Sequence, residues 1–312
     1  MTEQLERIRA VIGMESPPIE YVIDRGGIGF FAASLMDPDP VYRDINAAHA
    51  IGLNDLASPP VFFGDATGLR NVVAGERLTM FWNDIPLPKG WFSMASGDSF
   101  EFFEPVRPGM SVYAIERFVD AYERSGRNGP LIFFSYEKLF RSSAGNPVLR
   151  RLIHCVARPG TRTTRHAPVR RASDTLPEGA IRLPPLTVGP VSVRYLAMFA
   201  TATAEYVDIH YDADYARSLG LDGPIVQGLY KTALIGQMVA AFSGYAGSVR
   251  SLDVQHRRMD LADCTLTACG YIMPGTQMVT DGDVACRVWV ENQHGAVTTE
   301  GTARLRLPEG SH

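Results

Sequence analysis

The segment FATATAEYVDIHYD, residues 199–212, repeats a phrase that the chain has already used, FAASLMDPDPVYRD at residues 31–44. The match continues without gaps as far as Leu221, at a constant offset of 168 residues (199 minus 31). Internal similarity at this period indicates duplicated domains rather than a solenoid of short repeats. The two copies differ at one position of special interest, because Tyr42 in the first copy faces His210 in the second.

The length agrees with a duplication, since 312 residues suit two domains of about 150 residues each. The expected boundaries are residues 1–160 for the first copy, 161–183 for a connector and 184–309 for the second copy. A content of 46% hydrophobic and 21% charged residues is typical of a globular protein. Every hydrophobic run is too short to span a bilayer, so no membrane partner is expected.

Charge and cysteine content exclude several other classes of protein. A net charge of −4 does not favour binding to nucleic acid, which needs a broad basic surface. The one basic cluster, RTTRHAPVRRAS at residues 162–173, is expected to be a solvated linker, the alternative being that its arginines reach an anionic ligand. The N-terminal segment lacks the basic-then-apolar order of a secretory signal, which favours the cytoplasm. The four cysteines lack metal-site spacing and are expected to be free thiols.

Each copy contains runs rich in β-branched and aromatic residues that end in turn residues, which predicts antiparallel hairpins. The predicted strands are residues 98–106, 110–123, 131–142 and 148–158, and then 248–258, 264–273, 284–293 and 297–307. Before these strands, one long helix is expected in each copy. In the second copy it covers residues 224–242, is apolar on nearly every face and has Pro224 in its first turn, so it must be buried. A curved antiparallel sheet around one buried helix, formed twice, gives an α+β fold.

His210 is the histidine with the most chemical potential. Glu205 lies five residues before it, and Asp208 and Asp212 lie two residues to either side. A carboxyl group and an imidazole on such a segment can hold one water between them, with the imidazole removing its proton and the carboxyl supplying another. The other six histidines, His256 among them, lack such neighbours in the sequence.

The segment DGPIVQG, residues 222–228, leads into the predicted buried helix. Unpaired backbone N–H groups at a helix start carry partial positive charge and can hold a carbonyl oxygen that becomes an enolate. The alternative is that Gly223, Pro224 and Gly228 only start the helix and let it pack. The spacing favours neither reading.

The residues quoted so far resemble a known family. The stretch FATATAEYVDIHYDADYARSLGLDGPIVQGLYKTALIG, residues 199–236, resembles the signature of the MaoC-like (R)-specific enoyl-CoA hydratases and dehydratases. The first copy resembles the dehydratase-like N-terminal half of two-domain members, through DPDPVYRD, ASPPVF and EFFEPVRPGM. The resemblance implies a double hotdog, in which two curved antiparallel sheets are each wrapped round a long central helix. It also implies reversible addition of water to an α,β-unsaturated acyl thioester.

The resemblance also assigns roles to single residues. His210 occupies the position of the catalytic histidine, and Glu205 the position that the family usually gives to aspartate. Gly228 matches the glycine whose backbone N–H would hold the thioester oxygen, while Gln227 and Asp208 complete the expected substrate-binding set. In the first copy Tyr42 replaces the histidine, and a phenol with a pKa near 10 is a poor base. This copy is therefore expected to lack turnover, to close the acyl pocket and to cover the edge of the other sheet.

No metal or redox cofactor is expected, because backbone donors would polarise the thioester. The expected partner is an acyl-CoA or acyl-carrier thioester, and a homodimer is compatible with the sequence. Two alternatives remain open, a hotdog thioesterase and an acyl-thioester binding subunit without catalysis. The aromatic-rich segment 79–94 is expected to pack against the other copy or, alternatively, to line a pocket for a bulky acyl group.

Overall fold

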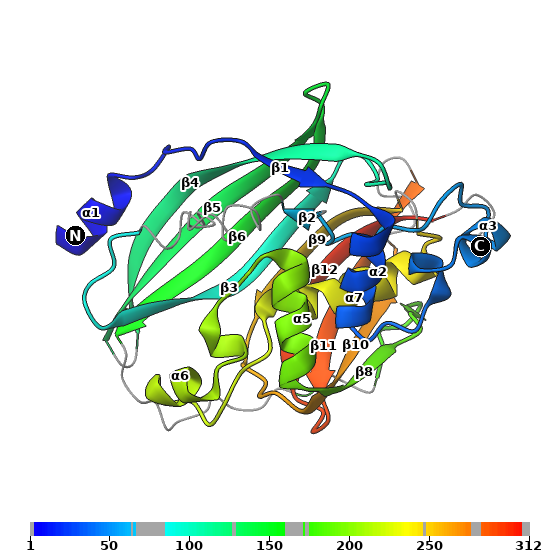
Figure 1. The fold of residues 1–312 in the computed structure, drawn as a ribbon. Helices are drawn as coiled ribbons and strands as arrows, with labels where there is room; N and C mark the ends of the chain where they lie inside the picture. The colour runs from blue at the N-terminus through cyan, green and yellow to red at the C-terminus, as the bar shows by residue number, and fades with distance from the viewer. Residues whose placement is uncertain are drawn as a thin grey trace.

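In the computed structural model the chain forms one 12-stranded sheet whose neighbouring strands are antiparallel, and the longer helices lie against it (Figure 1). The structure describes residues 3–63, 65–66, 85–126, 129–159, 171, 175–245, 248–275 and 282–307. The strand order is β2-β1-β4-β5-β6-β3-β9-β12-β11-β10-β7, with β8 also paired to β10. The first six strands in the chain and the last six therefore occupy separate halves of the sheet.

The predicted strands of the first copy are present, but only two of the predicted hairpins form. The strand predicted over residues 98–106 pairs with the strand over residues 148–158 and with a strand of the other copy, and not with the strand that follows it in the chain. The strands of the first copy are β1 (Ile19–Val22), β2 (Asp65–Ala66), β3 (Trp91–Phe102), β4 (Ser111–Gly126), β5 (Gly129–Ser142) and β6 (Pro147–Pro159). Strands β4, β5 and β6 follow one another in the chain and pair in that order, as short connections dictate. They form the long curved part of the sheet in Figure 1.

The second copy repeats this arrangement. Its strands are β7 (Ile181–Arg182), β8 (Leu186–Val191), β9 (Val249–His256), β10 (Cys264–Ile272), β11 (Asp283–Asn292) and β12 (Val297–Arg306). Every second residue of β10 is buried, because one face of the strand packs on the core. The sequence pattern thus predicted the four main strands of each copy.

The two sheets are joined edge to edge through β3 and β9. These strands pair from Gly97↔Gln255 to Glu101↔Ser251. Two separate curved sheets were expected, one in each copy. Backbone hydrogen bonds between β3 and β9 instead join them into one continuous sheet. Pairing across the seam also removes two exposed sheet edges, which would otherwise be sites of aggregation.

The short helices confirm the repeat at the level of the backbone. They are α1 (Glu3–Arg9), α2 (Arg25–Ser34), η1 (Pro40–Tyr42), α3 (Ile45–Ala50), α5 (Val193–Thr203), η3 (Asp208–His210) and α6 (Ala213–Ser218). Elements α5, η3 and α6 begin 168 residues after α2, η1 and α3 (193 minus 25, 208 minus 40 and 213 minus 45). The equivalent residues Phe31 and Phe199 face each other, with ring centroids 5.6 Å apart. Contact between equivalent positions indicates an approximate two-fold axis between the copies.

The central helix α7 (Gly228–Phe242) is buried along most of its length, as predicted. It begins four residues later than the predicted start at Pro224, which was wrong. The reason is that the preceding segment is extended: Ile225 forms a β-bridge with Leu261, and the Val226 N–H donates to the Asp260 carbonyl. The corresponding helix of the first copy, and most of the basic cluster at 162–173, lie outside the described residues.

All four cysteines are free, and Cys155, Cys264 and Cys286 are buried, in agreement with the prediction of free thiols. Among the described residues, every helix is too short or too polar to cross a bilayer.

Candidate active site

His210 lies in a tight turn between two short helices. It ends η3, and Asp212 caps the following helix α6 by accepting hydrogen bonds from the N–H groups of Asp214 and Tyr215, both at 2.9 Å. The His210 Nδ1–H donates to the carbonyl of Ile225 at 2.8 Å. The Ile225 N–H in turn donates to the Ile209 carbonyl at 3.2 Å. These two bonds fix the imidazole beside the extended segment that leads into α7.

The bond to Ile225 also decides the tautomer of His210. A carbonyl oxygen can only accept, so Nδ1 carries the proton and Nε2 keeps its lone pair. Burial lowers the pKa of His210 to about 4, against a smaller opposing effect of the Ile225 bond. The imidazole is therefore uncharged at neutral pH, with its single proton on Nδ1. The residue is nevertheless partly exposed, so a ligand can approach it.

Gly228 is the first residue of α7 and the only partly exposed residue in an otherwise buried stretch from Gly223 to Ala240. Its N–H has no acceptor in the part of the chain that the structure describes, as expected at a helix start. The helix packs closely here: a Cβ at Gly228 would lie 2.6 Å from the ring atoms Cδ2 and Nε2 of His256. Gly228 therefore serves both readings left open by the sequence, since it packs the helix and presents a free donor.

The predicted substrate-binding residue Gln227 is buried and faces inward. Its side-chain Nε2 donates to the Leu196 carbonyl at 2.9 Å and ties the start of α7 to α5. Its Oε1 is buried without a partner in the described structure. Asp208 instead lies at the surface, where its carboxylate accepts a hydrogen bond from the Tyr211 hydroxyl at 3.0 Å. The structure thus places these two residues away from each other.

Glu205 follows α5 and points toward the first copy. Its Oε1 accepts a hydrogen bond from Arg151 Nη1 at 2.9 Å, and its side chain is 17% exposed. Oε2 has no partner among the described residues. No hydrogen bond links Glu205 with His210 there either, although both are partly exposed on the same short segment. The two predicted catalytic residues are thus held by different neighbours, Glu205 by β6 and His210 by the segment before α7.

The sequence did not single out the charged residues behind Glu205. Arg151 is 5% exposed and forms an ion pair with Asp98, which is fully buried, at 2.7 Å. Burial raises the pKa of Asp98, but Arg151 and His256 outweigh this effect and hold the pKa well below its usual value. A signal existed in the strand VLRRLIHCV, because Arg151 is in phase with the inward residues Leu149 and Ile153. A charge on the buried face of a strand requires a partner.

The equivalent residues of the first copy have lost this arrangement. Tyr42, the counterpart of His210, is fully buried, and its hydroxyl has no partner in the described structure. Burial raises the pKa of Tyr42 well above its usual value, so the hydroxyl cannot act as a base at neutral pH. Burial also raises the pKa of Asp37, the counterpart of Glu205, to about 6. The first copy therefore lacks an unprotonated imidazole at this position, and its loss of turnover stays a prediction.

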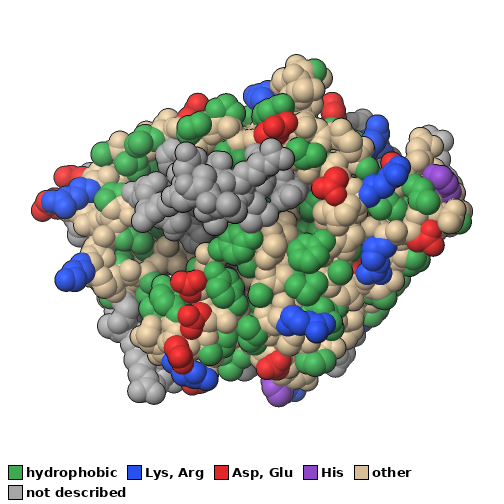
Figure 2. Space-filling model, in the orientation of Figure 1, with side chains coloured by type: hydrophobic (Ala, Val, Ile, Leu, Met, Phe, Trp, Pro, Cys, Tyr) green, Lys and Arg blue, Asp and Glu red, His purple; other side chains and the backbone are tan. Residues whose placement is uncertain are grey.

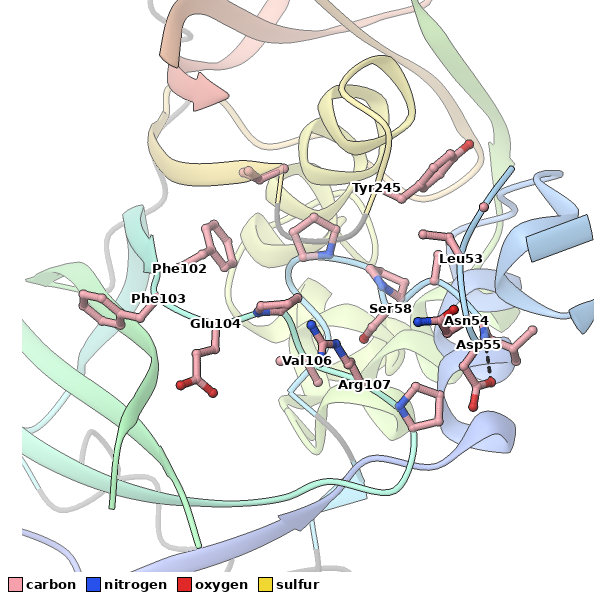
Figure 3. A pocket seen from close by; sticks show the side chains of 18 of the residues that line it. Leu53, Asn54, Asp55, Ser58, Phe102, Phe103, Glu104, Val106, Arg107 and Tyr245 are labelled. Carbon is pink, nitrogen blue, oxygen red and sulfur yellow. Dashed lines mark hydrogen bonds between the residues drawn. The ribbon is translucent and has the colours of Figure 1, made fainter. Parts of the chain in front are cut away.

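Two cavities lie near the C-terminal end of α7. The first, of about 410 Å³, is lined by residues 52–60 and 102–108 together with Tyr245, Val249 and Arg250 (Figure 3). In Figure 3 Ser58 and Arg107 lie near its centre, while Phe102 and Phe103 lie at one side. The second, of about 510 Å³, includes Asp37 and Gln237. The first cavity is lined mainly by residues of the first copy, whereas the second lies between residues 37–40 of the first copy and residues of the second copy. Neither cavity is lined by Glu205 or His210.

The surface around the candidate site is acidic. On the face shown in Figure 2, acidic side chains gather over the end of the second copy that carries α6. Asp208, Asp212 and Asp214 are exposed in this region. These charges lie on and next to the turn that carries His210.

Comparison with known sequences finds matches over the first copy. The family model for the FAS1-like dehydratase domain region matches residues 10–151. A UPF0336 protein of Parafrankia sp. (strain EAN1pec) is 30% identical over 141 residues, which are 45% of this chain and 86% of the relative. A UPF0336 protein of Streptomyces avermitilis is 32% identical over 103 residues, and these span 32% of this chain and 64% of the relative's length.

Comparison with solved structures covers nearly the whole chain. A MaoC-like dehydratase matches with a TM-score of 0.74 and 16% identity, over 96% of this chain and 100% of its own. A conserved hypothetical protein of Mycobacterium tuberculosis, described as a double hotdog, matches with a TM-score of 0.58 and 12% identity, over 98% and 100%. A protein of Lactobacillus plantarum named as an oleoyl thioesterase matches with a TM-score of 0.51 and 14% identity, over 95% and 97%.

The shared sheet, the buried helix and the internal repeat define a double-hotdog protein whose first half matches the FAS1-like dehydratase domain region. The chain belongs to the family of the UPF0336 proteins. The resemblance to the MaoC-like dehydratases that the sequence predicted is confirmed, and so is the α+β double-hotdog fold.

Proposed function

We propose that the chain catalyses the reversible hydration of an α,β-unsaturated acyl thioester, at a single site in the second copy. The observation that carries this proposal is the hydrogen bond from His210 Nδ1–H to the Ile225 carbonyl, at 2.8 Å. It leaves Nε2 as an unprotonated acceptor beside the segment that ends at Gly228. A base and a backbone donor are the two groups that addition of water to a conjugated thioester requires.

In the proposed reaction Glu205 and His210 hold one water. Because Glu205 Oε1 already accepts from Arg151, Oε2 is the oxygen left to hold that water. The water oxygen bonds to C3 while Nε2 of His210 takes its proton. The double bond shifts toward the thioester oxygen, which accepts a hydrogen bond from the Gly228 N–H. The sequence assigned the proton for C2 to the Glu205 carboxyl; because this carboxyl is paired with Arg151, we assign the step to the imidazolium, which returns the proton to C2. The reverse sequence removes the C2 proton and expels the hydroxyl as water.

The same residues suggest the scale of each contribution. Proton transfer by a positioned base contributes about 10² to 10⁴ in rate, and one backbone donor about 10² to 10³. Neither role calls for a metal ion or a redox group, because the backbone donor polarises the thioester. We propose that the substrate is a CoA or acyl-carrier thioester and that the enzyme is a hydro-lyase.

Incubation with crotonyl-CoA followed by mass spectrometry tests the proposal. The expected product gains one water and retains CoA, and His210→Gln removes the activity. Release of free CoA would instead show that water attacks the carbonyl, as in a thioesterase, a reading that the fold shared with the Lactobacillus plantarum protein also allows. The unmodified protein could also bind a panel of enoyl-CoA thioesters without converting any of them. That result would contradict both proposed activities, hydration and thioester hydrolysis.

A further inference from the structure

The first copy contributes a buried arginine to the candidate site of the second. Arg151 lies in β6 and Asp98 in β3, both in the first copy, and Glu205 lies in the second. Arg151 holds Asp98 with two nitrogens, Nε at 2.8 Å and Nη2 at 2.7 Å, and holds Glu205 with Nη1 at 2.9 Å. The planar guanidinium therefore fixes the two carboxylates relative to each other, as its fork geometry allows.

The other oxygen of Asp98 reaches the start of α7. Asp98 Oδ2 accepts from the Thr232 hydroxyl at 3.3 Å and lies 3.2 Å from Nε2 of His256. Because the pKa of Asp98 is held low, its carboxylate can only accept, so His256 Nε2 carries the proton. Thr232 is one turn after Gly228 on α7, and the His256 ring packs directly against Gly228. Asp98 thus supports the helix start that carries the proposed backbone donor.

One chain of contacts therefore connects the two ends of the proposed site. It runs from Glu205 through Arg151 and Asp98 to His256, which touches Gly228. Asp98 is 0% exposed and Arg151 5%, so these charges are little screened by water. Groups held this firmly keep a fixed geometry, and a displacement of about 1 Å can cost about 10²-fold in rate.

We infer that Arg151 is a positioning residue for the reaction, which holds the Glu205 carboxylate in register with the Gly228 N–H through Asp98. The inference rests on the proposed hydration. It gives the first copy a role in catalysis although its own histidine position is Tyr42: its strands β3 and β6 supply the anchor for the second copy's site. An arginine needed only to neutralise Asp98 would not require the third bond, to the partly exposed Glu205.

The test compares two neighbouring arginines on β6. Arg151→Lys keeps the charge, but one ammonium cannot replace three directed N–H bonds to two carboxylates. The expected result is a fall in kcat on crotonyl-CoA of about 10²-fold with KM nearly unchanged. Arg150→Lys is the matched control, since Arg150 faces the other side of the strand and pairs with Glu137 and Glu101. A parent-like kcat in Arg151→Lys, or an equal loss in both variants, would overturn the inference.

A second measurement does not depend on turnover. The free energy of unfolding is measured for Arg151→Lys, Glu205→Gln and the double variant. If Arg151 holds Glu205, the loss caused by Arg151→Lys is smaller when Glu205 is already replaced. Additive losses would overturn the link. An inactive parent protein would contradict the proposed hydration, but the unfolding free energies could still be compared. Failure of the proposed hydration can therefore be distinguished from failure of the link between Arg151 and Glu205.

If Arg151→Lys does not fold, the double variant Asp98→Asn/Arg151→Gln replaces it in the kinetic assay. This pair removes both buried charges together and avoids leaving one of them unpaired. Its kcat is again expected to fall about 10²-fold with little change in KM. A folded double variant with parental kcat would contradict the positioning role.

Discussion

Arg151 of the first copy donates a hydrogen bond to Glu205 of the second at 2.9 Å. This bond crosses the seam where β3 and β9 join the two sheets, so the candidate site is not contained in one copy. Duplication alone would give two equivalent sites. The asymmetry arises because the copies have diverged in complementary ways: one retains His210, and the other carries Arg151 and Asp98.

Asp98→Asn should destabilise the protein strongly, because it leaves the Arg151 guanidinium buried without its main counter-charge. Breaking one partner of a buried ion pair costs about 3 to 5 kcal/mol. Urea denaturation measures the change in the free energy of unfolding. Glu101→Gln on the same strand is the control, since Glu101 is half-exposed and its ion pair with Arg150 is expected to contribute at most about 1 kcal/mol. Equal effects of the two substitutions would refute the prediction.

Gly228→Ala should impair both packing and activity. The added methyl group would lie 2.6 Å from two ring atoms of His256, so either the helix start or the ring must move. Overpacking of this kind costs about 1 to 3 kcal/mol. Gly223→Ala is a matched control five residues earlier, where a Cβ would meet no atom within 4 Å. Thermal unfolding and the crotonyl-CoA assay should separate the two variants, and parental behaviour of Gly228→Ala would argue against a close approach at this position.

The sequence predicted the main strands of this fold because their hydrophobic alternation is local and survives in both copies. It predicted the repeat because the equivalent turns around Tyr42 and His210 keep the same aspartate caps, Asp44 and Asp212. It misplaced the start of α7, since the β-bridge of Ile225 with Leu261, in the connection between β9 and β10, overrides the helical preference of Pro224. Local pattern cannot show such a contact.

The residues of the candidate site also fall into two groups, those that the sequence predicted and those that it did not. His210 and Glu205 could be singled out because their acidic neighbours are close in the sequence. Asp98, Arg151 and His256 were missed because they meet only when β3, β6 and β9 align across the seam. Their separation along the chain is large, and neither Asp98 nor His256 was singled out by its own neighbours in the sequence. A charge on the inward phase of a strand was the one local sign, and it identifies Arg151 without identifying its partners.

The lowered pKa of His210 predicts a pH dependence of stability. In the folded protein the pKa is about 4, while the unfolded value is near 6.5, so the unfolded state binds the proton more tightly. The contribution of this residue is therefore complete above pH 6.5 and is lost as the pH falls toward 4, by up to about 3 kcal/mol. Urea denaturation between pH 4 and pH 8 should show that His210→Gln, whose amide can still donate to Ile225, is less sensitive to acid. Parallel pH profiles would contradict this.

Asp37 should show the opposite dependence. Burial raises its pKa to about 6 from an ordinary value of 3.8, so the folded state binds the proton more tightly and stability is lost as the pH rises from about 4 through 6. In the unmodified protein the Asp39 N–H donates to Asp37 Oδ1 at 2.9 Å. Asp37→Asn keeps an oxygen that can accept this hydrogen bond and removes the buried charge. The variant should be more stable than the parent at pH 7.5, by about 3 kcal/mol at most, and equal to it near pH 4.

The control for this prediction is Asp44→Asn, because Asp44 is an exposed cap of α3 and asparagine caps a helix about as well. Its stability should stay close to that of the parent at both pH values. The comparison also tests why the copies differ: Glu205 has a buried arginine beside it, whereas Asp37 has no ion pair among the described residues. A carboxyl group in that environment is a burden to the fold at neutral pH. If Asp37→Asn gives no stabilisation at pH 7.5, a compensating partner must lie close to Asp37, and the contrast with Glu205 would fail.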